Sequence, residues 1–84
     1  MAFILQLTKR ARKNLDNLPI EYRSRVIATL DDIVQDPFGG KKLSGKMERQ
    51  YSARVWPYRI IYKIYKKELL ILVINVDNRK EVYH

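Results

Sequence analysis

Two residue types that often build functional sites are scarce in this chain of 84 residues. It has no cysteine, so neither a disulfide framework nor a thiolate metal site is available. Its one histidine, His84, cannot form a metal site alone, and no carboxylate pair stands near it at ligand spacing. We therefore expect no bound metal and no cofactor.

Long apolar runs are also missing. The N-terminal run Ala2–Leu5 is far too short for a signal peptide or a membrane span. We expect a soluble protein without a membrane partner, and the lack of cysteine fits a bacterial or archaeal cytoplasm. Because no repeat or linker divides the sequence, residues 1–84 are expected to form one domain.

Positive charge is abundant and uneven. The net charge is +8, and residues 1–40 carry six Lys/Arg against five Asp/Glu, whereas residues 41–84 carry eleven against four. A basic half of this kind indicates a polyanionic partner, nucleic acid first. A basic surface that only keeps the protein in solution would explain the charge alone equally well.

The predicted order of elements is a strand, two helices and three antiparallel strands. The clearest signal is a single apolar helix face in Ile20–Gln35, formed by Val26, Ile27, Leu30, Ile33 and Val34. The other expected elements are a strand at Phe3–Leu7, a helix at Thr8–Leu15, a basic loop at Lys41–Lys46, two strands within Arg49–Tyr65 and a strand at Leu69–Val76. This is an α+β fold in which an N-terminal strand and an antiparallel helical hairpin pack on one face of a small antiparallel sheet.

The stretch Arg49–Tyr65 is expected to be a hairpin with a short turn at Trp56-Pro57. Alternation assigns two sets of side chains to its two faces. Toward the helices we expect Tyr51, Ala53, Val55, Ile60 and Tyr62, and on the open face Ser52, Arg54, Arg59 and Lys63. Arg79 follows the last strand, with Tyr83 four residues later, so three guanidinium groups and a tyrosine form a plausible site for a phosphate-rich ligand.

These residues resemble a known family. The segments LSGK, YSARV, YRIIYKI and LLILVINVDNRKEVY, in this order and spacing, are similar to the RelE/ParE superfamily of toxins from toxin–antitoxin systems. The terminal NRKEVY looks more like the RelE branch than the ParE branch. The resemblance implies a microbial RNase-like fold and a type II toxin that cleaves mRNA in the ribosomal A site without a metal. Its implied partners are the ribosome, mRNA, a RelB-like antitoxin, and operator DNA only through the antitoxin complex.

The family's site residues carry over by motif. They fall on the second-strand Arg54, on Arg59 of the YR pair, on Arg79 and on Tyr83 as catalytic residues. Further RNA-binding positions are Lys41, Lys42, Lys46, Arg49, Ser52 and Lys63. At position 52 RelE has a lysine that activates the attacking hydroxyl, whereas this chain has a serine, so Lys46 or Lys63 would have to substitute.

The side-chain chemistry agrees with these roles and leaves alternatives open. Arginines bind phosphate oxygens bidentately and are poor proton donors. Tyr83 can stack on a nucleotide or act as a base whose pKa neighbouring cations lower. Arg54 can equally be an ordinary exposed strand residue, and Arg79 can simply complement Asp77 or Glu81. His84 is a terminal residue for which a frayed end is the simpler interpretation.

Three functions remain open. The first is a ribosome-dependent endoribonuclease, which needs Arg54, Arg59, Arg79 and Tyr83. The second is a ParE-like toxin that binds and poisons DNA gyrase without nuclease activity, and Ser52 favours it. The third is a toxin relic that only binds antitoxin and operator DNA as a co-repressor, which toxicity in cells would exclude.

Overall fold

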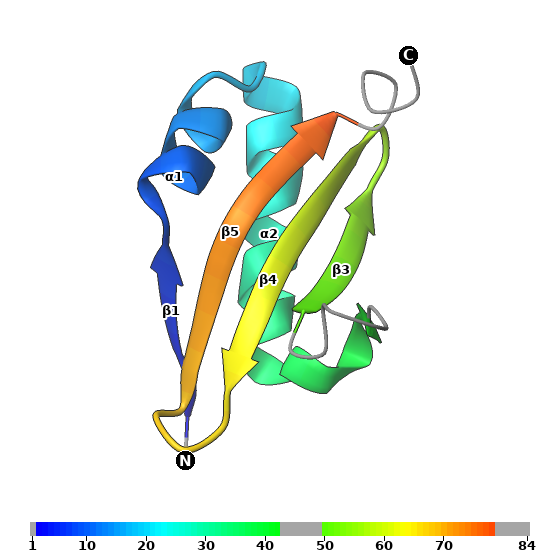
Figure 1. The fold of residues 1–84 in the computed structure, drawn as a ribbon. Helices are drawn as coiled ribbons and strands as arrows, with labels where there is room; N and C mark the ends of the chain where they lie inside the picture. Colours follow the sequence, from blue (N-terminus) through cyan, green and yellow to red (C-terminus); the bar gives the residue numbers. More distant parts are fainter. Residues whose placement is uncertain (1, 43–49, 79–84) are drawn as a thin grey trace.

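A twisted sheet with helices on one face forms the domain (Figure 1). The computed structural model describes residues 2–42 and 50–78, apart from the side chain of Lys41. The elements are β1 (Ile4–Leu7), α1 (Lys9–Asp16), α2 (Ile20–Gln35), the 3-10 turn η1 (Pro37–Gly39), β2 (Lys41–Lys42), β3 (Gln50–Val55), β4 (Tyr58–Tyr65) and β5 (Leu70–Asn78). The α+β class and the helical pair on one face are confirmed.

The sheet has the strand order β1-β5-β4-β3-β2. Strands β3, β4 and β5 are antiparallel neighbours, as the sequence predicted. The N-terminal strand differs from the expectation, because β1 joins the sheet beside β5 and runs parallel to it, which makes the sheet mixed. Parallel pairing follows from the long connection between the two strands, which contains both helices.

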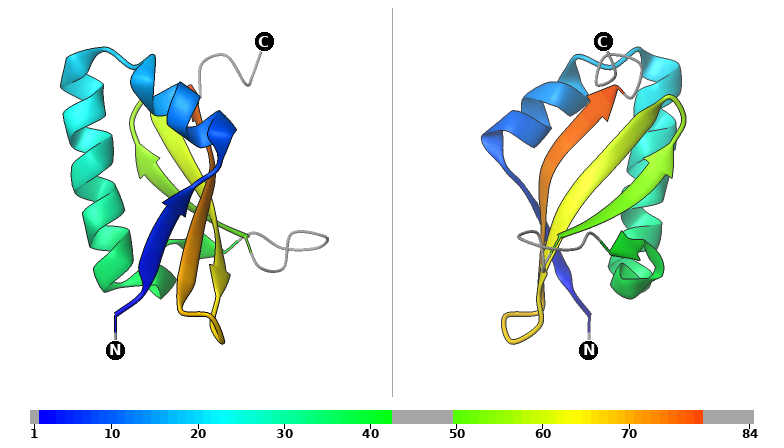
Figure 2. Two further views of the ribbon diagram at one scale, coloured as in Figure 1. Left: turned by 90° about the vertical axis from the view of Figure 1, so that its left-hand side faces the viewer. Right: turned by 45° about the vertical axis from the view of Figure 1, so that its right-hand side comes forward.

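Two local sequence signals determine where the helices begin. The hydroxyl of Thr8 caps α1 by accepting a hydrogen bond from the Ala11 backbone N–H at 3.0 Å, and it donates to the Ile74 carbonyl of β5 at 2.9 Å. Pro19 precedes α2, whose bounds equal the predicted ones. Figure 2 shows α2 along one side of the sheet, with α1 near the end where β5 finishes.

The core lies between α2 and the inner face of the sheet. From α2, Val26, Leu30 and Ile33 are buried, whereas Ile27 is 51 % exposed, so its predicted place on the packed face is wrong. Successive residues of a helix are about 100° apart around its axis, so Ile27 points away from the packed face on which Val26 lies. From the sheet, every second residue of β4 is buried.

A hydrogen bond joins the core to η1. The hydroxyl of Tyr62, a fully buried residue, donates to the Pro37 carbonyl at 2.9 Å, and its ring stacks on Tyr51 at 5.7 Å. Burial raises the pKa of Tyr62. A hydrogen bond with the Gly40 backbone partly lowers this pKa, whereas electrostatic interactions with Tyr51 and Asp36 raise it further. The neutral hydroxyl is therefore the form that holds the turn after α2 against β4.

Gly40→Ala tests how tightly the turn after α2 packs against Tyr62 of β4. A Cβ at Gly40 would collide with the Tyr62 hydroxyl and lie 2.9 Å from the Ser52 carbonyl oxygen. We expect the free energy of unfolding to fall by about 1–3 kcal/mol in urea denaturation. Gly39→Ala is the matched control, because the nearest atoms there belong to the Asp36 side chain, which can move. Equal stability of the two variants would contradict the account.

Candidate functional site

The open face of the sheet, which is the face turned away from α2, carries a row of charged side chains. Arg54 of β3 and Arg59 of β4 are directly opposite in the strand register, and Asp77 of β5 is opposite Arg59. Opposite residues on one face have Cβ atoms about 4.5–5.5 Å apart. We call Arg54, Arg59 and Asp77 the charged row; Arg54 is exposed and the other two are half-buried.

The local structure of the strands determines the positions of the residues in the charged row. The hairpin turns through Trp56-Pro57, so the last residues of β3 and the first residues of β4 are paired without a slip. Asp77 is held by its own strand, since the Asn75 side-chain amide donates to a carboxylate oxygen of Asp77 at 2.5 Å. On the other side of β5, Asn14 of α1 accepts from the Val76 backbone N–H at 3.2 Å.

The row suits an anion. Two guanidinium groups side by side repel each other, and like charges directly opposite in a sheet are destabilising. Asp77 offsets part of this cost for Arg59 but is not opposite Arg54. A phosphate bound across Arg54 and Arg59 would relieve the repulsion, because each guanidinium offers paired N–H donors.

A pocket of about 650 Å³ adjoins the row at the edge of β3. Arg54, Arg59 and Ser52 line its sheet side. Asp32 of α2 and Asp36, the residue after α2, line the other side. The carboxylates disfavour phosphate on the helix side. Anion binding is therefore expected toward the open face, at the arginines.

The structure brings some of the expected site residues together and separates others. Lys63 is half-exposed on the open face, opposite Gln50 and Leu72. Ser52, expected on that accessible face, is only 7 % exposed, because it sits between β2 and β4 in the sheet. The serine at position 52 is therefore a buried strand residue with little surface for a ligand.

The remaining expected residues lie elsewhere or outside the described part. Lys41 and Lys42 form β2, which the sequence predicted as loop, and Lys42 lines a different pocket at the other end of the sheet. Lys46, Arg49, Arg79, Tyr83 and His84 lie outside the described residues. Asp77 was not expected in the site; its position two residues after Asn75 at a strand end was the available signal.

Within residues 2–42 and 50–78, no three histidine, cysteine, aspartate or glutamate side chains are grouped so as to hold a metal ion. None of the helices in these residues has the length and apolarity that a bilayer crossing requires.

Comparison with known proteins decides the family. Residues 5–83 match the family model described as ParE toxin of type II toxin–antitoxin system, parDE. The chain belongs to the RelE/ParE superfamily of type II toxins. Toxin RelG of Mycobacterium tuberculosis is 28 % identical over 99 % of this chain and 98 % of that protein.

Solved structures place this superfamily member in the RelE branch. A chain of the toxin–antitoxin complex RelBE2 from Mycobacterium tuberculosis is 27 % identical, with a TM-score of 0.84 over 94 % of this chain and all of that one. Isolated RelE toxin of E. coli is also 27 % identical, with a TM-score of 0.82 over 98 % of this chain and 92 % of that one. The predicted family and branch are thus confirmed.

Inorganic phosphate tests the charged row. At a concentration equal to its dissociation constant, a ligand of the folded state adds about 0.4 kcal/mol of stability, and so raises the Tm by about 2–3 °C. We expect this rise in the unaltered chain and a loss of most of it in Arg59→Gln. Arg12→Gln, which removes an exposed arginine of α1, is the control and should keep the rise. A rise that survives in Arg59→Gln would contradict the assignment.

Proposed function

We propose that this RelE-branch toxin is a ribosome-dependent endoribonuclease that cleaves mRNA in the A site and thereby stops translation. The observation that carries the proposal is the pairing of Arg54 with Arg59 on an open sheet face of a RelE-like fold. A nuclease needs such paired cations at a phosphate, whereas a protein that only binds antitoxin does not.

In the reaction the ribose 2′-oxygen forms a bond to the adjacent phosphorus while the bond from phosphorus to the 5′-oxygen breaks. A 2′,3′-cyclic phosphate remains, and the departing 5′-oxygen takes a proton from solvent water. Arg59 and Arg54 bind the nonbridging phosphate oxygens and balance the charge that develops on them. Arg79 follows Asn78, the last residue of β5, and Asn78 is opposite Tyr58 beside the same hairpin turn. Arg79 then supplies a further cation, and Tyr83 stacks on the nucleotide being cut or orients it.

The proton of the 2′-hydroxyl needs an acceptor, and Ser52 is unsuited to that role because it is buried and weakly basic. We assign the role to Asp77. Its carboxylate is beside Arg59 in the charged row, and the Asn75 amide fixes its orientation. A carboxylate next to a phosphate-binding arginine can accept the proton while the arginine holds the phosphate. Lys63, two residue pairs further along the open face, is the alternative acceptor.

The proposed partners are a RelB-like antitoxin, the ribosome and mRNA, with operator DNA reached only through the antitoxin complex. Similar chains were solved as RelBE2 of Mycobacterium tuberculosis and as the RelE-RelB complex of Pyrococcus horikoshii, the latter 26 % identical. On this chain, half-exposed Ile61 and Leu72 lie beside Lys63 on the open face. Apolar side chains among cations suit an acidic amphipathic helix, or a strand added to the sheet.

A gyrase-directed toxin is the second candidate. It is favoured by the ParE name of the matching family model and by the buried serine at position 52. Under this alternative the charged row binds a protein partner, and mRNA stays intact during growth arrest.

Arg59→Ala and Arg79→Ala are each expected to abolish growth arrest, because each removes a cation from the cleaved phosphate. Primer extension on a reporter mRNA after brief induction should show cuts within translated codons for the unaltered chain and none for Arg59→Ala or Arg79→Ala. The cuts should vanish when translation is blocked. Arg12→Ala, with its exposed side chain on α1, should keep both toxicity and cuts. Full toxicity of both Arg59→Ala and Arg79→Ala would contradict the assignment of the phosphate site.

Asp77→Asn is expected to slow cleavage by about 10²–10⁴, the usual contribution of a general base. Asp77→Glu should recover part of the rate, because it restores a carboxylate. Single-turnover cleavage on programmed ribosomes measures both, and circular dichroism checks that each variant is folded. An unchanged rate in Asp77→Asn would contradict the role of Asp77 as proton acceptor and would favour Lys63. Lys63→Gln tests that alternative in the same assay.

A further inference from the structure

A second pocket, of about 680 Å³, lies at the end of the sheet opposite the charged row. Its lining includes the aromatic residues Phe38, Tyr51 and Tyr65 and the lysines Lys42, Lys66 and Lys67. Arg59 and Tyr65 are six positions apart in β4, which is about 20 Å along a strand. The two pockets share no lining residue, so this pocket is a separate feature.

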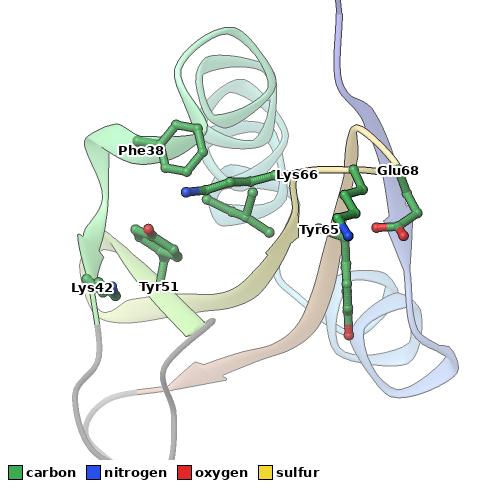
Figure 3. Close-up of a pocket in the computed structure, with 8 residues that line it drawn as sticks. Phe38, Lys42, Tyr51, Tyr65, Lys66 and Glu68 are labelled. Carbon is green, nitrogen blue, oxygen red and sulfur yellow. The ribbon is translucent and has the colours of Figure 1, made fainter.

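Figure 3 shows how the side chains divide the pocket. Phe38 and Tyr51 lie on one side, Tyr65 and Glu68 on the other, and the Lys66 side chain extends toward Phe38. The Lys66 ammonium is 5.4 Å from the centre of the Phe38 ring, and the Phe38 and Tyr51 rings meet edge to face at 6.0 Å. An exposed aromatic ring therefore has a cation beside it.

The wall of the pocket is held in place by the fold. Phe38 belongs to η1, which the Tyr62 hydroxyl ties to β4, and its ring also meets Phe3 at 6.2 Å. The turn Lys66–Leu69 is closed by the Leu69 N–H, which donates to the Lys66 carbonyl at 3.3 Å. The Leu69 carbonyl in turn accepts from the Ile4 N–H at 2.7 Å. Leu69 has a φ of 51°, a left-handed conformation that a leucine adopts only where its surroundings impose it.

The chemistry of the lining selects the ligand. Three lysines against Glu68 leave the lining with two positive charges in excess. Phe38 is 46 % exposed, so part of its ring is open to a ligand. A nucleotide uses both features at once, because its base stacks on an aromatic ring and its phosphate binds lysine ammonium groups. An acidic peptide would use the lysines but leave the ring faces uncovered.

We propose that this pocket, which we call the lysine–aromatic pocket, binds one unpaired nucleotide of an RNA strand, with the base on Phe38 and the phosphate at Lys66 and Lys67. The choice of RNA rests on the proposed function, whereas the nucleotide chemistry rests on the pocket itself. The site binds and positions RNA away from the bond that is cut.

Adenosine 5′-monophosphate is the probe, titrated into the full-length chain labelled with ¹⁵N. We expect backbone amide shifts at Phe38, Tyr51 and Lys66–Glu68, and weaker binding of inorganic phosphate or adenosine alone. Lys66→Gln combined with Lys67→Gln should weaken binding by about fivefold or more, and so should Phe38→Leu, which keeps an apolar side chain but removes the stacking ring. The matched control combines Lys9→Gln with Lys13→Gln on α1, loses the same charge and should bind like the unaltered chain.

Three results would overturn the proposal: shifts confined to Arg54 and Arg59, equal affinities in all variants, or displacement of the nucleotide by a glutamate decapeptide at lower concentration than by RNA. The last result would assign the pocket to an acidic peptide. Nucleotide titration and mRNA cleavage, both measured with the unaltered chain, separate this proposal from the proposed function. If cleavage fails but the nucleotide still binds at Lys66 and Phe38, the proposed function is wrong and the pocket assignment is kept. If cleavage occurs without such binding, only the pocket assignment is wrong.

Discussion

The alternation of side chains along β4 is the constraint on which the site depends. Every second residue from Tyr58 to Ile64 is buried, and the residues between them face the open side. A slip of one residue would turn Ile60 and Tyr62 out of the core, so the hydrophobic effect fixes the register of β4 against both neighbours. The same register sets Arg54, Arg59 and Asp77 in one row. The position of the charges is therefore enforced by core packing on the other face of the sheet.

The two ends of the sheet have different chemistry. At the end where the hairpin turns, two arginines and an aspartate are in register across three strands, which suits phosphate chemistry with proton transfer. At the other end, the described lining residues include lysines and aromatic rings, which suits binding by stacking and charge. Part of the positive charge in the second half of the chain thus lies on two surfaces about 20 Å apart. In this account one holds the bond that reacts and the other holds the strand that contains it.

Local pattern predicted much of this architecture. The apolar period of α2, the cap at Thr8 and the alternation of the hairpin gave the helices, the strands and the pairing of Arg54 with Arg59. The parallel direction of β1 and the short β2 depend on long-range pairing, which no local period encodes. Burial of Ser52 depends on β2 as its neighbour, and Asp77 enters the site only through its register with Arg59. The lysine–aromatic pocket combines η1, β3 and a turn that are distant in sequence, so composition alone could not assemble it.

Cleavage of a defined mRNA on purified ribosomes tests the central claim most directly. The mRNA would carry a 2′-deoxyribose at the A-site nucleotide in one sample and a ribose in the other, with the chain added in single-turnover amounts. The account predicts cleavage of the ribose strand only, on ribosomes only, with a 2′,3′-cyclic phosphate at the new end. Equal cutting of both strands would contradict attack by the 2′-hydroxyl. Intact mRNA together with gyrase-dependent DNA breaks would contradict the nuclease itself.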